Sequence, residues 1–156
     1  MIKFNKIFVF FTLFLILSSC GYSPIFSKKD VNFSIEEIEF FGDRYIEEKI
    51  NYTLSSYKNK SGNEKKVSLI ITSSKNTITA SKNSKGEAQT NRISIDVNAK
   101  IILAKNNIVE KNFSKSSIYD ILDRKSEQKL VENKLIENLS NEIALQIIFE
   151  ILKKTK

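Results

Sequence analysis

The chain has 156 residues, 41% hydrophobic and 28% charged, with one proline and four glycines. This length and composition are typical of one folded domain and exclude a fibrous or wholly disordered protein. The absence of histidine excludes a histidine base, a histidine metal ligand and a Ser-His-Asp triad, and the single cysteine excludes an internal disulfide and a CxxC site.

The first 19 residues have the pattern of a signal peptide. Lys3 and Lys6 give a positive start, and residues 7–17 form an apolar run that only Thr12 interrupts. Eleven residues at about 1.5 Å each cover roughly 17 Å, far less than the ~30 Å hydrocarbon core, so no stable membrane span is predicted. We expect residues 1–19 to be cleaved from the mature chain.

The only cysteine, Cys20, directly follows Leu17-Ser18-Ser19. This arrangement resembles the lipobox of bacterial lipoproteins, in which the thiol receives a diacylglyceryl group, the leader is cut and the new amino terminus is acylated, with palmitate among the acids used. Such chains, at about 0.8 kcal/mol per buried methylene, anchor a protein without spanning the membrane. The alternative is a buried free thiol. Because Gly21 is not the aspartate that retains enteric lipoproteins at the inner membrane, analogy implies outer-membrane delivery.

The positive charge has two interpretations. Removing residues 1–19 lowers the net charge from +7 to +5, and 22 of the 25 basic residues in the whole chain are lysine. With 15 asparagines and many isoleucines, this bias is also what an AT-rich genome produces without selection for a basic surface. An exported lipoprotein rarely meets nucleic acid, so anionic lipid or lipopolysaccharide is the more available partner.

The first half of the mature chain predicts a tether, a strand and a helix. Residues 20–30 predict a lipidated tether before a single domain of residues 31–156. Apolar residues alternate over 31–40 with one change of parity, which predicts a strand with a bulge. From Asp43, a fair N-cap, the spacing predicts a helix with one apolar stripe: Ile46, Ile50, Leu54 and Tyr57. The stretch 58–66 has no apolar residue and predicts a loop.

The middle of the chain predicts three further strands. The second strand starts at Val67, and after a polar stretch Ile78 resumes with changed phase before a turn around Gly86. Six apolar residues then alternate with polar ones over 93–103, which predicts a strand with one buried and one solvent-exposed face. A two-residue hairpin turn is predicted at Asn106-Asn107, followed by an antiparallel strand over 109–121.

The remaining residues predict one long helix, from Asp123 or Arg124 to Lys153. Apolar residues recur at intervals of three or four residues and form a stripe: Leu130, Val131, Leu135, Leu139, Ile143, Ile147 and Ile151. Near its end the helix becomes apolar on most sides, which indicates either burial in the core or cover by a partner. The order β-α-β-β-β-α predicts an α+β fold, a two-layer sandwich with two helices on one face of a four-stranded, mostly antiparallel sheet.

The stretch CGYSPIF, residues 20–26, followed by a domain with this element order, resembles the lipopolysaccharide-assembly lipoprotein family, LptE. The resemblance implies an outer-membrane lipoprotein at the periplasmic face, anchored by its N-terminal lipid. Its expected partners are an LptD-like β-barrel, which it enters as a plug, and lipopolysaccharide, which it binds and helps to insert into the outer leaflet. No member of the family is an enzyme, so no catalytic residue or cofactor is implied.

A basic stretch at residues 75–92 gives the sequence a candidate binding site. It carries four cations against one acid, Glu87, on two predicted strands joined by a turn: Lys75, Lys82, Lys85 and Arg92. The candidate contact residues are Lys82, Lys85 and Arg92. Charge-assisted contacts of about 1.5 to 3 kcal/mol each are available to lipid A phosphates when sheltered. The alternative is that these side chains only keep an exposed turn soluble.

Catalytic signatures are absent from the sequence, which contains no GxSxG, P-loop or GxGxxG motif. Six acids lie within 36–48, and a metal or acid-base site there is one interpretation. Alternation puts Glu37 and Glu39 together on one strand face while the helical acids point outward, so a solvated acidic face is predicted instead. Two alternatives to the LptE interpretation stay open. One is a lipoprotein accessory subunit of another envelope machine, for barrel assembly or transport, and the other is a small periplasmic hydrolase that uses two carboxylates.

Overall fold

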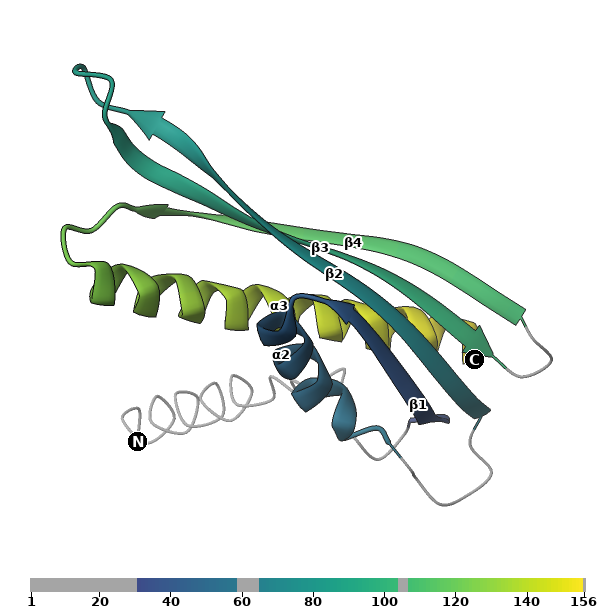
Figure 1. The fold of residues 1–156 in the computed structure, drawn as a ribbon. Coiled ribbons are helices and arrows are strands. Elements are labelled where there is room, and N and C mark those ends of the chain that lie inside the picture. Colours follow the sequence, from purple (N-terminus) through teal and green to yellow (C-terminus); the bar gives the residue numbers. More distant parts are fainter. Residues whose placement is uncertain (1–30, 59–64, 104–106, 156) are drawn as a thin grey trace, which may run out of the picture. The chain divides into compact units, whose positions relative to one another are not determined.

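A four-stranded sheet and two helices make up the described part of the chain, residues 31–58, 65–103 and 107–155 (Figure 1). In this computed structural model the elements are β1 (Phe33–Gly42), α2 (Arg44–Ser55), β2 (Lys65–Lys82), β3 (Ala88–Leu103), β4 (Asn107–Asp120) and α3 (Lys125–Thr155). The predicted order β-α-β-β-β-α and the α+β class are confirmed.

The strands lie in the order β1-β2-β3-β4. β1 and β2 pair in parallel, since the connection through α2 returns the chain to the same end of the sheet. β2–β3 and β3–β4 are antiparallel, so the sheet is mixed and mostly antiparallel. The predicted bulge in β1 is confirmed by a register shift between Ile35 and Glu37.

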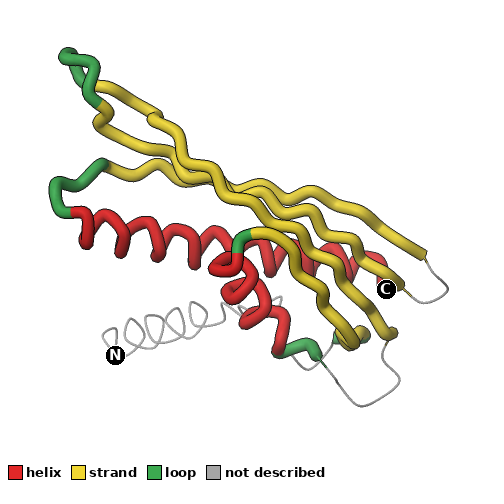
Figure 2. The backbone as a smooth tube through the Cα atoms, in the orientation of Figure 1, coloured by secondary structure: helices red, strands yellow, loops and turns green. Residues whose placement is uncertain are grey.

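Both helices cover the same face of the sheet, which we call the inner face (Figure 2). Alternation along the strands sends every second side chain to this face, and there they are buried. No described element covers the opposite face, the outer face. The core therefore lies between the inner face and the helices, and its strand residues include Val67, Leu69, Ile71, Ile93, Ile95, Val97, Ala99 and Ile101.

Helix α2 forms as its pattern predicts. The carboxylate of Asp43 accepts hydrogen bonds from the backbone N–H groups of Tyr45 and Ile46, at 2.9 and 3.2 Å, which satisfies two of the free donors of the first turn. Its stripe Ile46, Ile50 and Leu54 is fully buried. The next residue of the predicted stripe, Tyr57, stacks on Phe33 with ring centroids 5.6 Å apart, which joins the end of α2 to β1.

One predicted boundary in the first half of the domain differs from the structure. Residues 59–64 of the predicted loop lie outside the described residues, but Lys65 and Lys66 already belong to β2, where they pair with β1. The predicted phase change at Ile78 places this side chain on the outer face, where it is half exposed, and β2 runs on to Lys82. Pairing with β3 runs from Ser68 to Lys82 and so continues through the phase change.

The predicted alternation of β3 is confirmed, with five of its six apolar residues buried and Leu103 partly buried. The turn predicted at Asn106-Asn107 is wrong for Asn107. Asn107 is the first residue of β4 and pairs with Leu103, while Asn106 lies outside the described residues. β4 then runs antiparallel to β3, as predicted.

Helix α3 follows its predicted stripe from Leu139 onward, and one turn earlier it buries Ile136, which the stripe did not include, more deeply than Leu135. Leu139, Ile143, Ile147 and Ile151 are buried, but Leu130 is 69% exposed. Adjacent residues of a helix point about 100° apart, and it is Val131 that packs against the core, so Leu130 cannot share that face. At the apolar C-terminal end Ile148 joins the core, whereas Leu145 and Phe149 are 39% and 57% exposed.

Candidate functional site

The hairpin of β2 and β3 carries the predicted basic residues on an extension that we call the arm, residues 75–92. Figure 1 shows the tip of this hairpin reaching past the end of β4 and the start of α3. β4 ends at Asp120, opposite Thr90, so beyond Thr90 the two strands pair only with each other. Every β2 residue from Ser74 to Lys82 is exposed. Beyond Thr90 the arm is thus a two-stranded ribbon without a core of its own.

The tip of the arm is held by the side chain of Asn83. Its Oδ1 accepts hydrogen bonds from the backbone N–H groups of Lys85 and Glu87, at 2.9 and 3.0 Å, and its Nδ2 donates to a carboxylate oxygen of Glu87 at 2.8 Å. Gly86 completes the turn with a φ of 81°, a conformation that glycine adopts without strain. The predicted turn is therefore confirmed, and its one acid is bound to an amide.

The three predicted contact residues lie on this arm but do not form one cluster. Lys82 ends β2, Lys85 is in the turn, and Arg92 lies on β3 opposite Ile78. Four residues separate Ile78 from Lys82, which at about 3.3 Å per residue is roughly 13 Å along the strand. The structure thus groups two lysines at the tip and places the arginine nearer the base of the arm.

None of these three cations makes an ion pair with any described residue. By contrast, Lys75 at the base of the arm lies 3.5 Å from the carboxylate of Asp43 and so helps to cap α2. Lys75 therefore has a structural partner, whereas Lys82, Lys85 and Arg92 are available to an external anion.

Arg92 has an apolar setting that the sequence pattern did not reveal. On the outer face it is flanked by Ile78 of β2 and Ile118 of β4, its directly paired neighbours, which are 51% and 53% exposed. A cation between two exposed isoleucines is suited to the boundary between a phosphate and an acyl chain. The change of parity at Ile78 was the available signal, because it moves that side chain onto the face of Arg92.

The junction between β1, α2 and β2 is built around Gly42 and Asp43. Gly42 has a φ of 114°, and a Cβ there would lie 1.9 Å from the carbonyl oxygen of Ser73. The hydroxyl of Ser73 accepts a hydrogen bond from the backbone N–H of Asp43 at 3.2 Å. Partial burial raises the pKa of the Asp43 carboxyl, but the N–H of Ile46, the charge of Lys75 and the N–H of Tyr45 together hold it below its ordinary value.

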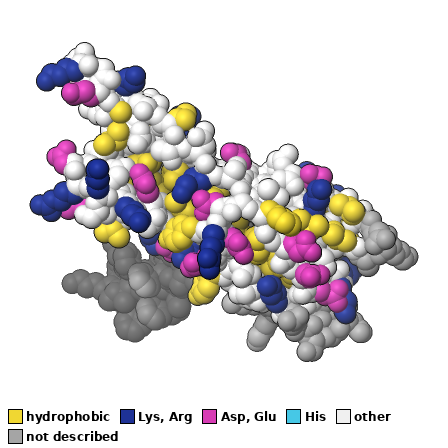
Figure 3. All heavy atoms as spheres, viewed as in Figure 1, with side chains coloured by type: hydrophobic (Ala, Val, Ile, Leu, Met, Phe, Trp, Pro, Cys, Tyr) yellow, Lys and Arg dark blue, Asp and Glu magenta, His cyan; other side chains and the backbone are white. Residues whose placement is uncertain are grey.

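The acidic side chains of β1 lie at the surface. Glu36 forms an ion pair of 2.6 Å with Lys66, and Glu37 and Glu39 are exposed. Within residues 31–58, 65–103 and 107–155 no group of three or more Asp, Glu or Cys side chains could hold a metal ion. In the view of Figure 3 acidic and basic side chains are interspersed over the face of the molecule that is seen.

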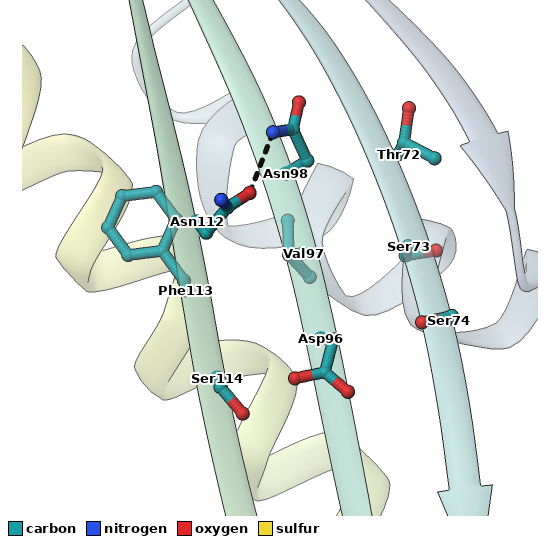
Figure 4. Close-up of a pocket in the computed structure, with 9 residues that line it drawn as sticks. All are labelled: Thr72, Ser73, Ser74, Asp96, Val97, Asn98, Asn112, Phe113 and Ser114. Carbon is teal, nitrogen blue, oxygen red and sulfur yellow. Dashed lines mark hydrogen bonds between the residues drawn. The ribbon is translucent and has the colours of Figure 1, made fainter.

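Two open hollows lie on the described domain. One, of about 320 Å³, is on the sheet and is lined by residues of β2, β3 and β4, among them Asp96, Asn98 and Asn112 (Figure 4). The other, of about 570 Å³, lies between α2 and α3 and is lined by residues that include Tyr52, Glu48 and Glu137. Its acids are already paired in part, because Glu48 binds Lys49 at 3.2 Å and Glu137 binds Lys134 at 3.4 Å.

The predicted lipid-attachment residue, Cys20, and residues 1–19 lie outside the described residues. Among the helices that are described, none is both long enough and apolar enough to cross a membrane.

Comparison with known proteins finds no matching family model and no matching curated protein. Solved structures do match. The rare lipoprotein B from Shewanella oneidensis is 14% identical with a TM-score of 0.57, over 76% of this chain and 96% of that chain. An uncharacterized lipoprotein B from Nitrosomonas europaea is 15% identical with a TM-score of 0.56, over 80% and 88% of the respective chains. At these identities the likeness establishes a shared fold.

Proposed function

We propose that this protein is an outer-membrane lipoprotein, anchored through Cys20, that partners an LptD-like β-barrel, binds lipopolysaccharide and assists its assembly into the outer leaflet. One conjunction carries the proposal: a lipobox-like segment ending at Cys20 precedes a domain whose fold matches 96% of a rare lipoprotein B. The motif CGYSPIF supports the choice of the LptE family among lipoproteins. We assign the protein no catalysis, because its sequence has no histidine and no nucleophile motif.

The arm is the part of the domain best suited to lipopolysaccharide. Lipid A presents phosphates beside acyl chains, and the arm presents cations without ion-pair partners in the described domain beside exposed Ile78 and Ile118. Each charge-assisted hydrogen bond to a phosphate is worth about 1.5 to 3 kcal/mol when it is sheltered from water. On the proposed function, Arg92 contacts the head group at the boundary with the chains while Lys82 and Lys85 contact phosphates farther along.

A pull-down from outer membranes tests the partner. Full-length protein with a C-terminal affinity tag is extracted in mild detergent, and the co-purifying barrel is identified by mass spectrometry. An LptD-like barrel is the expected result. Recovery of a different barrel or transporter, without affinity for lipopolysaccharide, would instead assign the chain to another envelope machine.

Binding of lipopolysaccharide is tested with the triple variant Lys82→Gln, Lys85→Gln, Arg92→Gln. We expect it to bind at least about tenfold more weakly, since each tenfold step corresponds to only 1.4 kcal/mol. The matched control, Lys111→Gln, Lys129→Gln, Lys154→Gln, removes the same charge from exposed lysines outside the arm. Equal losses in both variants would show that net charge, not the arm, governs binding.

The anchor is tested by mass spectrometry of the native protein. We expect a mature chain that starts at a diacylglyceryl-modified, acylated Cys20, and we expect the Cys20→Ser variant to leave the membrane fraction. An unmodified thiol with residues 1–19 still attached would reject the lipoprotein assignment.

A further inference from the structure

The outer face of the sheet carries an unusual block of small polar side chains. Strand pairing arranges them in three rows across β2, β3 and β4: Thr72-Asn98-Asn112, Ser74-Asp96-Ser114 and Asn76-Ser94-Ser116. Bulkier rows bound the block on both sides, with Arg92 and its isoleucines at one end and Lys100 with Ile70 and Glu110 at the other. The block therefore forms a low region of the face, and the hollow of about 320 Å³ lies over its first two rows.

Hydrogen bonds fix the direction of two amides beside this hollow. Asn98 donates through Nδ2 to Asn112 Oδ1 at 2.7 Å (Figure 4). The same Nδ2 donates to Glu110 Oε1 at 2.9 Å. Both of its donors are used, which leaves Asn98 Oδ1 as an acceptor, while Asn112 Nδ2 stays available as a donor. Asp96, in the next row, makes no ion pair or hydrogen bond with a described residue.

This arrangement matches the hydrogen-bonding chemistry of a sugar. A sugar hydroxyl donates and accepts at the same time, so neighbouring hydroxyls need an acceptor and a donor side by side, which Asn98 and Asn112 supply. Asp96 adds a carboxylate acceptor, and Ser74 and Ser114 flank it with hydroxyls. These groups stand on paired strands and not on loops, so their geometry is held fixed. The volume of the hollow falls at the lower end of the range for small-molecule sites, roughly 300 to 1,000 Å³.

We propose that this hollow binds the hydroxyl groups of an oligosaccharide through Asp96, Asn98 and Asn112. The site is separate from the cations of the arm and does not require them. Two sources supply the same chemistry, a free oligosaccharide and the saccharide of a glycolipid such as lipopolysaccharide.

The test uses full-length mature protein in a detergent without a sugar head group, since a glucoside detergent would compete. The first probe is lipid-free core oligosaccharide released from lipopolysaccharide by mild acid, with binding followed by saturation-transfer difference NMR. The second probe is intact lipopolysaccharide. The hollow variant is Asn98→Ala, Asn112→Ala, and the matched control is Asn76→Ala, Ser94→Ala, from the row that does not line the hollow. Neither pair changes the net charge.

We expect the hollow variant to bind at least tenfold more weakly and the control to stay within twofold of wild type. If the hollow variant binds the lipid-free probe more weakly than wild type, a free oligosaccharide is sufficient for binding. If it binds only the intact lipopolysaccharide more weakly, the ligand is the saccharide of a glycolipid. The proposal is overturned if neither probe binds in a way that depends on the hollow, or if both variants lose binding equally while their melting temperatures match wild type. The arm triple variant should still bind the lipid-free probe, so failure of the arm and failure of the hollow give different results.

Discussion

The two ends of the β2–β3 hairpin differ in whether helices cover the strands. At the base, side chains on the inner face of β2 and β3 are sealed by α2 and α3, and residues such as Leu69 and Ile95 are almost completely buried. On the arm beyond Ser74 no helix covers β2, and every one of its side chains is exposed. The base therefore supplies the free energy of folding, and the arm is free to hold charged groups that a core would not tolerate.

The largest expected contrast is between isoleucines of the two regions. Ile95→Ala at the base removes a fully buried side chain and should lower the free energy of unfolding by about 3 kcal/mol, within the usual range for such cavities. Ile78→Ala on the arm, where the side chain is half exposed, should cost about 1 kcal/mol or less. Urea unfolding followed by circular dichroism measures both. Similar losses would mean that the arm is part of the cooperative core.

Two glycines, one at the base and one at the tip, allow a second comparison of the two regions. Gly42→Ala at the base adds a Cβ 1.9 Å from a backbone carbonyl oxygen at a positive φ, so the junction must shift, and we expect a loss of about 2 to 3 kcal/mol. Gly86→Ala at the tip meets nothing within 4 Å, so only its φ of 81° opposes it, at about 1 kcal/mol. The comparison of urea midpoints separates collision from backbone strain. Equal midpoints would show that the junction relaxes at no cost.

The base could be predicted from sequence better than the arm, for a physical reason. Burial imposes a period on side chains, so the alternation over 93–103 and the stripe from Leu139 to Ile151 indicate their elements directly. An exposed ribbon carries no such constraint, and the isoleucine neighbours of Arg92 depend on strand register, which pairing sets and local sequence does not. The amide pair Asn98 and Asn112 has the same origin, since fourteen residues separate them in the chain.

One polar group inside the base offers a gain in stability instead of a loss. Ser140 of α3 is fully buried, and its hydroxyl has no hydrogen-bond partner among the described residues. Ser140→Ala removes an unsatisfied group and adds a better helix former, so the free energy of unfolding should rise by about 1 kcal/mol. Thermal unfolding measures the change. A drop in melting temperature would indicate that the hydroxyl binds a group other than these protein atoms, such as a buried water.

The smallest expected effect lies where the two regions meet, at the pair of Asp43 and Lys75. Asp43→Asn keeps a capping oxygen for α2 but removes the charge that faces Lys75 at 3.5 Å, at a cost of about 0.5 kcal/mol for a pair of this exposure. The pKa of the Asp43 carboxyl is lowered in the native state, so its contribution is present above the ordinary aspartate pKa and is lost as the pH falls through the lowered value. Wild type should therefore be more stable than the variant at neutral pH, and the difference should vanish in acid, below that lowered pKa. Urea midpoints over this pH range measure it, and a difference that persists in acid would assign the effect to the shape of the cap and not to the charge that connects base and arm.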